Sequence, residues 1–235
     1  MLISVIIPAY NEERRLPSFL ASVLEYAKTH PYIHEVIVVD DGSTDGTAAY
    51  VEKEAQTNQV LRLVIQKKNQ GKGAAIRAGV MAATGDYVVF IDADGATKID
   101  QLPRMVAAFE SGADIAIGNR WMPGANVHRS TIFRHVSGWL NKTYMSFFGL
   151  GSIDTMCGFK GYKTPVAQSL FANLIEERWL FDTEIAYKAV KRKYTIVNFP
   201  VTWESIDGSK LDTKTLILSG ARILPLIRKI RKQTS

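Results

Sequence analysis

Residues 87–95 read Tyr-Val-Val-Phe-Ile-Asp-Ala-Asp-Gly, and this stretch decides the fold class. Its first five residues form a continuous apolar run, without the alternation of a strand that has one face in water. A strand that is apolar on both faces is buried on both faces, as in a parallel sheet covered by helices. Two aspartates and a glycine follow directly, so acidic side chains are expected where this strand ends.

The same pattern recurs along the first half of the chain. Short apolar runs alternate with stretches of helical spacing, and the order strand, helix, strand predicts an open α/β fold with a doubly wound, mostly parallel sheet flanked by helices. Strands are expected at residues 3–8, 35–40, 61–65, 87–92 and 114–117. A cap cluster at residues 43–45 and the glycines Gly71 and Gly73 mark the starts of two helices.

The second half is less regular. Helical patterns fit residues 132–148, 166–174, 181–191 and 215–232, and a strand pair is expected near residues 158–162 and 195–203. Residues 118–130 are the longest loop-like piece, and we interpret them as a substrate loop rather than a domain boundary.

Composition narrows the class of protein. Hydrophobic residues make up 46% and charged residues 22% of the 235 residues, which is typical of a globular domain. The single cysteine, Cys157, excludes an intrachain disulfide framework and a multi-cysteine zinc site. We see no secretory signal pattern and no run of about 20 apolar residues, so we expect a cytoplasmic protein. The net charge of +6 indicates either an anionic partner or a solvated basic surface.

Acidic residues follow three of the predicted strands. Ligands of open α/β sheets bind beyond the carboxyl ends of the strands, so these side chains should share one crevice. The residues are Glu12 after the first strand, Asp40 and Asp41 after the second, and Asp92 and Asp94 after the fourth. A nucleoside diphosphate leaves readily only if its developing charge is neutralised, and Mg²⁺ or Mn²⁺ on Asp92 and Asp94 would do this.

Other nucleotide chemistries lack their motifs. The first strand is not followed by Gly-x-Gly-x-x-Gly, and no phosphate-loop Gly-Lys-Ser/Thr occurs, which argues against hydride transfer and P-loop hydrolysis. Lys72, in the NQGKG stretch at 69–73, opens a helix where backbone amides and its ammonium could meet a phosphate. The alternative for Lys72 is an ordinary solvated lysine.

Four motifs together resemble glycosyltransferase family two with its GT-A fold. They are SVIIPAYNEE at 4–13, VVDDGSTD at 38–45, NQGKG at 69–73 and FIDAD at 90–94. The resemblance implies an inverting transferase that uses a nucleotide-sugar donor. It further implies that Pro8, Tyr10, Glu12 and Asp41 hold the base and ribose. Asp92 would then lie near the diphosphate and the ribose, and Asp94 would ligate the metal.

Three later motifs resemble the dolichyl-phosphate glucosyltransferase branch. They are DTMCGFK at 154–160, ERWLFDTE at 177–184 and WESIDGSK at 203–210. This resemblance implies UDP-glucose as donor and a polyprenyl or dolichyl phosphate as acceptor. A GDP-mannose-dependent mannosyltransferase is the alternative, although Ala96 stands where that pattern often has a polar residue.

A phosphate acceptor changes what the site requires. It is already anionic at neutral pH, so it can attack without a general base, and the site needs cations instead. Arg120, Arg129 and Arg134 are the candidates, because a planar guanidinium can bind phosphate bidentately, and Lys210 is a fourth. We take Arg129 and Arg134 as catalytic in this sense. The alternative is that these arginines are surface residues.

The last helix has an apolar stripe with basic residues opposite. A basic amphipathic helix can lie in a membrane interface, which would make the protein peripheral at the cytoplasmic face, or it can pack on the core. The stripe comprises Leu216, Ile217, Gly220, Ile223, Leu224, Ile227 and Ile230. Residues 145–150 are a second possible lipid contact, also explicable as core.

Two rival functions remain. A processive polysaccharide synthase normally carries Gln-x-x-Arg-Trp, but Ile175 stands where the glutamine should be. A catalytically silent binding module is disfavoured by the intact Asp92 and Asp94, and no aromatic-rich basic face or zinc motif supports nucleic acid. We therefore expect one domain over residues 1–235. Its parts are a nucleotide-sugar half at 1–118, an acceptor half at 119–212 and a basic amphipathic helix at 213–235.

Overall fold

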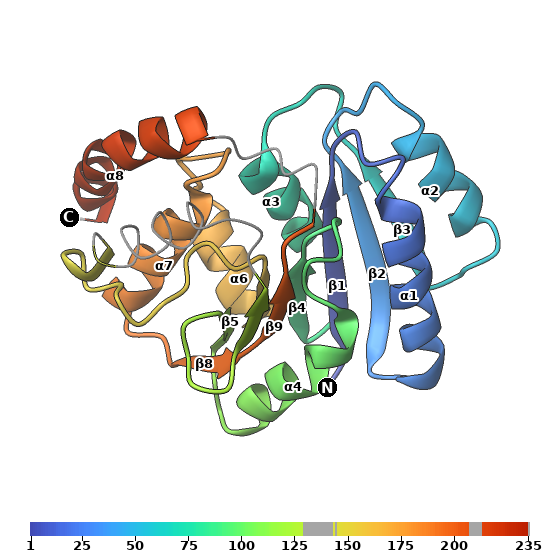
Figure 1. Cartoon of the computed structure of the whole chain (residues 1–235), viewed down its shortest axis with the longest axis horizontal. Coiled ribbons are helices and arrows are strands. Elements are labelled where there is room, and N and C mark those ends of the chain that lie inside the picture. Colours follow the sequence, from blue (N-terminus) through green and yellow to red (C-terminus); the bar gives the residue numbers. More distant parts are fainter. Residues whose placement is uncertain (129–142, 144, 207–212, 235) are drawn as a thin grey trace.

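The structure is a computed structural model that describes residues 1–128, 143, 145–206 and 213–234. Within this part of the chain, a central sheet of seven strands has the order β3-β2-β1-β4-β7-β5-β8 (Figure 1). The strands are β1 (Ile3–Ala9), β2 (Ile33–Asp40), β3 (Leu61–Ile65), β4 (Tyr87–Ile91), β5 (Ile115–Asn119), β7 (Phe159–Lys163) and β8 (Ile196–Pro200). The helices are α1 (Leu16–Thr29), α2 (Thr47–Ala55), α3 (Lys72–Ala82), η1 (Ile99–Gln101), α4 (Leu102–Glu110), α6 (Thr164–Phe171), α7 (Phe181–Lys191) and α8 (Thr213–Thr234).

The predicted doubly wound, mostly parallel sheet is confirmed. β3, β2, β1 and β4 are parallel neighbours, and β7 is antiparallel to both β4 and β5. All five strands expected in the first half are present. The expected pairing of the two later strands was wrong, because β5 lies between β7 and β8 and pairs with both. β7 therefore starts at the edge of the sheet where its neighbours end.

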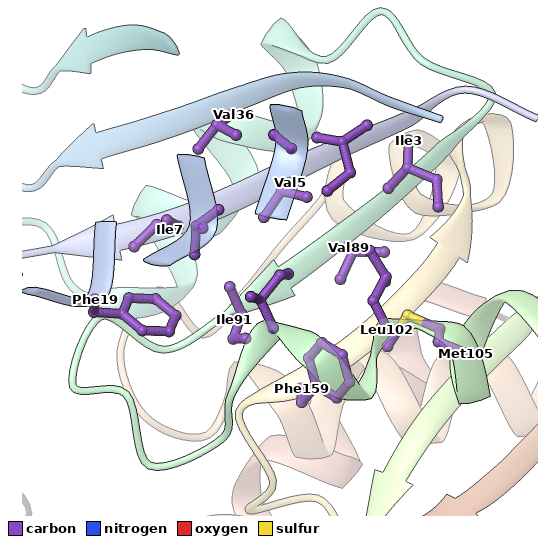
Figure 2. Packing of buried hydrophobic residues seen from close by; sticks show 14 of the residues in the cluster. Ile3, Val5, Ile7, Phe19, Val36, Val89, Ile91, Leu102, Met105 and Phe159 are labelled. Carbon is purple, nitrogen blue, oxygen red and sulfur yellow. The ribbon is translucent and has the colours of Figure 1, made fainter. Parts of the chain in front are cut away.

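Helices cover both faces of the sheet, as the continuous apolar runs predict. The side chains of Val5 and Ile7 face a core shared with α1 and α4, whereas Ile6 between them faces a core shared with α3, α6 and α7. Figure 2 shows the first of these cores, where Ile3, Val5 and Ile7 lie beside residues of β4 and α4. Burial on both faces leaves the edges of the sheet as the places where polar side chains can gather.

The cap cluster fixes the start of α2 and the end of β1 together. The N-cap of α2 is Gly46, and the Asp45 carboxylate just before it accepts the amide of Thr47, the first helical residue, at 3.0 Å. The Ser43 hydroxyl accepts the Asn11 amide at 2.9 Å, and the Asn11 side chain in turn accepts the Thr44 amide. The segments after β1 and β2 are thus tied to each other.

The loop-like stretch at 118–130 contains more structure than the sequence suggested. Its first two residues complete β5, and Asn126–His128 forms β6, which pairs in parallel with β9 (Thr202–Glu204). The Glu204 amide also donates to the Ala96 carbonyl at 2.9 Å. This small second sheet is therefore fastened to the segment that follows β4.

The described part of α8 packs on the core. Ile223, Leu226, Ile227 and Ile230 are buried in the cluster that also contains α7 side chains. Of the two alternatives for this helix, core packing is the one found at residues 223–230. Leu224, which belongs to the same predicted stripe, is not part of this packing and is 41% exposed.

The apolar stretch at residues 145–150 was expected to be either a lipid contact or part of the core, and its residues differ in this respect. Met145 and Leu150 are buried in the core, whereas Phe147 is 81% exposed.

Candidate active site

The carboxyl ends of β1, β2 and β4 form one edge of the sheet. The Asp41 amide donates to the Ala9 carbonyl at 2.8 Å, so the chain after β2 stays beside the chain after β1. Asp92 and Asp94 follow β4, which is the other neighbour of β1. The structure therefore brings the acidic strand ends together, as expected for an open parallel sheet.

Lys72 joins the carboxylates that follow β4. Its ammonium lies 2.5 Å from Asp92 Oδ1 and 5.9 Å from the centre of the Trp179 ring. Burial works against the charge of this lysine, but Asp92 and then Asp182 outweigh it, so the pKa of Lys72 is raised. Lys72 is thus a cation of the site rather than a solvated lysine.

Asp94 occupies a different environment from Asp92. One of its carboxylate oxygens accepts the Ala96 amide at 3.0 Å. Burial and then the charge of Asp92 raise the pKa of Asp94 above its ordinary value. The Ala96 amide and the charges of Lys72 and Arg15 offset this only in part. A further cation beside these two half-buried carboxylates would favour the charged form of Asp94.

Glu12 is held by an arginine that faces the same aspartates. Arg15 donates to both Glu12 carboxylate oxygens, at 2.7 and 2.5 Å. The Glu12 hydrogen bonds, which outweigh the cost of burial, raise the pKa of Arg15, with smaller contributions from Asp94 and Asp92. Glu12 thereby positions a guanidinium toward the aspartates. The role that the resemblance implies for Glu12 itself, on the base or ribose, stays a prediction.

Asp41 organises the glycine loop before α3. Its two carboxylate oxygens accept the Gln70 and Gly71 amides, each at 2.8 Å. Burial raises the pKa of Asp41, and these two amides limit the rise. Asp41 therefore supports the loop that carries Lys72, and its predicted contact to the nucleotide base stays a prediction.

The start of α3 is not an open phosphate site. The Gly73 amide donates to the Arg178 carbonyl, and the Ala74 amide donates to the Glu177 carbonyl at 3.0 Å. Gly71 has φ 113° and lies so close to this segment that a Cβ would be 2.6 Å from the Glu177 carbonyl oxygen. The backbone amides expected to meet a phosphate are used instead to dock residues 177–178. The side chain of Lys72 is what remains for an anion.

This docking brings Arg178 and Trp179 to the rim of the site. Both side chains are exposed, and the charge of Arg178 acts on Asp41 while Trp179 stands over Lys72. Both residues belong to the ERWLFDTE motif and to the stretch compared above with Gln-x-x-Arg-Trp, but neither was expected at the donor site. These motifs were the available signal, because a contact with α3 cannot be predicted from local spacing.

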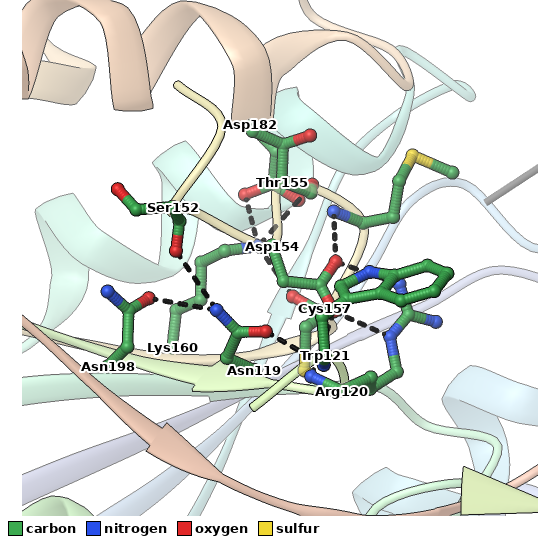
Figure 3. A network of polar contacts seen from close by, with 11 residues as sticks. Asn119, Arg120, Trp121, Ser152, Asp154, Thr155, Cys157, Lys160, Asp182 and Asn198 are labelled. Carbon is green, nitrogen blue, oxygen red and sulfur yellow. Dashed lines mark hydrogen bonds and ion pairs between the residues drawn. The ribbon is translucent and has the colours of Figure 1, made fainter. Parts of the chain in front are cut away.

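Arg120 is engaged with a buried carboxylate. Its guanidinium donates to both Asp154 oxygens at 2.8 and 2.9 Å (Figure 3). It also lies 5.2 Å from the centre of the Trp203 ring. Burial opposes both charges, yet the pairing outweighs it, so the pKa of Arg120 is raised and that of Asp154 lowered. The prediction that Arg120 binds the acceptor stays open, since in this structure its guanidinium holds Asp154.

The remaining predicted residues fall into two groups. Pro8 and Tyr10 lie at the end of β1 and are half-buried beside the acidic strand ends. Arg129, Arg134 and Lys210 lie outside the described residues, and so does most of the helix expected at 132–148.

The fold and the carboxyl edge of the sheet define a class of protein first: an α/β protein whose acidic strand ends and Lys72 suit a phosphorylated ligand. The chain belongs to the family described as "Glycosyl transferase family 2", whose model matches residues 4–171. It is accordingly a glycosyltransferase, as the motifs in the first half indicated.

Relatives with known names match over most of the chain. A protein from Drosophila melanogaster named "Dolichyl-phosphate beta-glucosyltransferase" is 39% identical, over 89% of this chain and 69% of its own length. A protein of the same name from Dictyostelium discoideum is 35% identical, over 96% of this chain and 73% of its own length.

Solved structures share the fold. Glucosyl-3-phosphoglycerate synthase from Mycobacterium tuberculosis, in complex with Mn²⁺, UDP and phosphoglyceric acid, matches with a TM-score of 0.72 and 19% identity. The match covers 97% of this chain and 78% of that one. S. aureus TarS 1-349 in complex with UDP-GlcNAc matches with a TM-score of 0.58 and 20% identity, over 95% of this chain and 66% of that one. The fold is thus the GT-A fold expected from the sequence.

Proposed function

We propose that this protein transfers glucose from UDP-glucose onto a polyprenyl phosphate of the dolichyl type, with inversion at the anomeric carbon. The observation that carries the proposal is the arrangement of Asp92, Asp94 and Lys72 at the carboxyl edge of the sheet. The names of the relatives support the sugar and the lipid phosphate.

The carboxylates fit a divalent cation. Asp92 and Asp94 supply hard oxygen ligands. Burial and the charge of Asp92 raise the pKa of Asp94, so a bound cation would favour the ionised form of this carboxylate. No group of three or more metal-binding side chains occurs among the described residues. This suits Mg²⁺ or Mn²⁺, which commonly bind through one or two carboxylates together with substrate phosphates. When bound, the ion would neutralise charge on the departing diphosphate.

Residues of the chain complete the donor site in this proposal. Lys72 and Arg15 bring two positive charges to the aspartates, and both are held by carboxylates of the site. Pre-positioned charges stabilise a leaving group more effectively than water does, because they need no reorganisation during the reaction. Pro8, Tyr10 and Asp41 would hold the nucleoside, as the resemblance implies.

The acceptor needs no general base in this mechanism. A lipid phosphate carries its own negative charge, so the chain must supply cations and exclude water. Arg129, Arg134 and Lys210 are our candidates, with Arg120 as a fourth that is anchored by Asp154. We further propose peripheral contact with the cytoplasmic face of a membrane, where such a lipid resides. In the described part of the chain, no helix has both the length and the apolar character needed to cross a bilayer.

A donor and acceptor panel tests the proposal. Purified protein with Mn²⁺ or Mg²⁺ is incubated with UDP-glucose, other UDP-sugars or GDP-mannose, and with dolichyl phosphate, undecaprenyl phosphate or free polyprenol. We expect glucosyl transfer to lipid phosphate and tighter binding of UDP than of GDP. Transfer from GDP-mannose alone would identify the mannosyl alternative, and equal transfer to free polyprenol would contradict the anionic-acceptor mechanism.

A further inference from the structure

A fully buried lysine lies behind the candidate active site. Lys160 on β7 is 1% exposed, and its ammonium donates to the Cys157 carbonyl at 2.5 Å and to the Thr155 carbonyl at 3.5 Å (Figure 3). It also lies 3.0 Å from Asp182 Oδ1, at the start of α7, and 5.5 Å from the centre of the Phe90 ring. Burying such a group is costly unless it is paired and hydrogen-bonded.

This lysine and Arg120 hold the two ends of one loop. Residues 154–158 begin at Asp154, which Arg120 binds through both carboxylate oxygens. They end just before β7, where the ammonium of Lys160 binds two carbonyls of the loop. Figure 3 shows both charges converging on this short segment from opposite sides.

The same loop contacts Asp92 directly. The Asp92 amide donates to the Gly158 carbonyl at 3.1 Å. A Cβ at Gly158 would lie only 2.0 Å from Asp92 Oδ2, so the glycine permits the backbone to approach the carboxylate. The position of the loop therefore sets the position of Asp92 on one side.

Asp92 in turn holds Lys72, whose ammonium lies 2.5 Å from Asp92 Oδ1. The Lys160–Asp182 pair thus reaches Asp92 through the loop and the Gly158 backbone, and it reaches Lys72 through Asp92.

Stability does not explain why the pair is ionic. A buried ion pair is often no more stabilising than well-packed apolar side chains of similar volume, because desolvation offsets the attraction. An ion pair does constrain the relative position of its two side chains, since each charge requires the other beside it. A role in orienting the loop and α7 therefore explains the ionic character of the pair, which a role in stability does not.

We propose that the Lys160–Asp182 ion pair is a positioning pair that fixes Asp92 and Lys72 for the departing diphosphate. Neither residue touches the donor, and the inference rests on the proposed function. Displacing a reacting group by about 1 Å can cost a hundredfold in rate, so loss of the pair should act mainly on kcat.

The first test removes both charges at once. Lys160→Met together with Asp182→Leu keeps similar side-chain volumes and leaves no unpaired buried charge. We expect kcat for glucosyl transfer to fall about ten- to a hundredfold, while the Kd for UDP with Mn²⁺ changes less than about threefold. The control is Lys163→Met, which breaks the pair with Asp114 at the other end of β7 and should change neither value.

A second comparison separates positioning from folding. Asp182→Asn keeps the shape but loses the charge, and Asp182→Glu keeps the charge. We expect the asparagine variant to lose kcat and the glutamate variant to recover part of it. If the double variant does not fold, this comparison decides, and equal kcat for the two single variants overturns the proposal.

The outcomes are distinguishable from failure of the proposed function. If the parent protein neither binds UDP nor transfers glucose, the proposed function is wrong and this inference falls with it. If the parent is active and the folded double variant keeps kcat within about twofold, only the positioning role is wrong. Equal losses in kcat and UDP affinity would also overturn it.

Discussion

Asp92 and Asp94 stand two residues apart and yet have different partners. Asp92 is enclosed by Lys72 and Gly158, whereas Asp94 accepts a single described backbone amide and retains a raised pKa. A carboxylate whose charge is poorly compensated gains most from a metal ion. Replacing Asp94 should therefore impair metal binding most clearly.

We expect Asp94→Asn to lower kcat/KM at least about a hundredfold, since a bound metal stabilises the leaving group by several kcal/mol. Excess EDTA should abolish turnover of the parent. Asp86→Asn is the control, because Asp86 precedes the same strand at its opposite end and is exposed. Steady-state kinetics and Mn²⁺ titration of both variants provide the measurement. Full turnover of the parent in EDTA would remove the metal from the mechanism.

The acceptor arginines give a second prediction at this scale. A charge-assisted hydrogen bond contributes about 1.5–3 kcal/mol, so Arg129→Ala and Arg134→Ala should each lower kcat/KM for the lipid about ten- to a hundredfold. UDP affinity should be unchanged, and lysine at either position should restore activity only in part. Arg192→Ala, at an exposed position after α7, is the control. Unchanged lipid turnover in both variants would show that the acceptor binds elsewhere.

The sequence indicated the charged residues of the site better than it indicated their partners. Asp92, Asp94 and Lys72 were expected near a phosphate because strand ends and helix starts carry local signals. The partners of Arg120 and Lys160 could not be predicted in the same way. Each partner is more than 20 residues distant and is brought close only because β7 inserts between β4 and β5.

At the scale of elements, β2 has near its start a buried carboxylate that joins three segments. Glu35 accepts the Ser4 hydroxyl at 2.8 Å and the Thr84 amide at 2.7 Å, and it pairs with Arg62 of β3. Burial opposes the charge, but the hydrogen bonds from Thr84 and Ser4 outweigh it and lower the pKa of Glu35 to about 2. This end of the sheet is therefore held by an ionised side chain.

We expect Glu35→Gln to lower the free energy of unfolding at pH 7 by on the order of 2 kcal/mol. A carboxylate whose pKa is lower in the folded state stabilises the protein above its unfolded pKa. The stabilisation is lost as the pH falls through the folded pKa. The difference between parent and variant should thus shrink between about pH 4.5 and pH 2. Glu25→Gln, in an exposed pair with Lys28, should show no such dependence in urea denaturation.

The terminal helix gives the second prediction for an element. Ile227 is 1% exposed in the core that α8 shares with α7, so Ile227→Ala should cost about 2–5 kcal/mol of stability. Leu224→Ala, one turn earlier and largely exposed, should cost less than about 1 kcal/mol. Chemical denaturation of both variants measures the difference. Equal losses would mean that α8 does not pack as described.

The elements were predictable to different degrees for a physical reason. A continuous apolar run reports burial on both faces, so β1, β2 and β4 were correctly placed. Strand neighbours depend on connections between distant segments, so the expected pair near residues 158–162 and 195–203 was wrong. The apolar stripe of α8 was similarly ambiguous, because a core and a membrane select the same side chains.

At the scale of the whole molecule, the central sheet contains strands from both expected halves of the chain. β7 from the acceptor half lies between β4 and β5, and residues 177–178 dock on the start of α3.

Charge is distributed unevenly around α8. Arg228, Lys229 and Lys232 are exposed on the side of this helix away from its buried isoleucines. In Figure 1, α8 lies on the opposite side of the molecule from α1 and α2.

This distribution leads to a prediction about membrane contact. If α8 packs on the core through one face, its other face can still attract an anionic surface, and each basic residue near such a surface contributes about 1 kcal/mol. Replacing Arg228, Lys229 and Lys232 by glutamine should therefore weaken binding to vesicles containing phosphatidylserine about a hundredfold. UDP binding should be unaffected, because the three residues lie apart from the strand ends. Co-sedimentation with vesicles measures the change.

A matched variant and salt separate this attraction from insertion of apolar side chains. Replacing the exposed lysines Lys28 of α1, Lys53 of α2 and Lys67 after β3 removes the same charge. This should leave vesicle binding nearly intact, because α1 and α2 lie on the opposite side of the molecule from α8 in Figure 1. Raising the ionic strength from about 0.1 M to about 1 M shortens the screening length from about 10 Å to about 3 Å, so the parent should dissociate. Binding that survives high salt and is equally strong on neutral vesicles would indicate an apolar contact instead. Phe147, which is 81% exposed, is the first side chain to replace in that case.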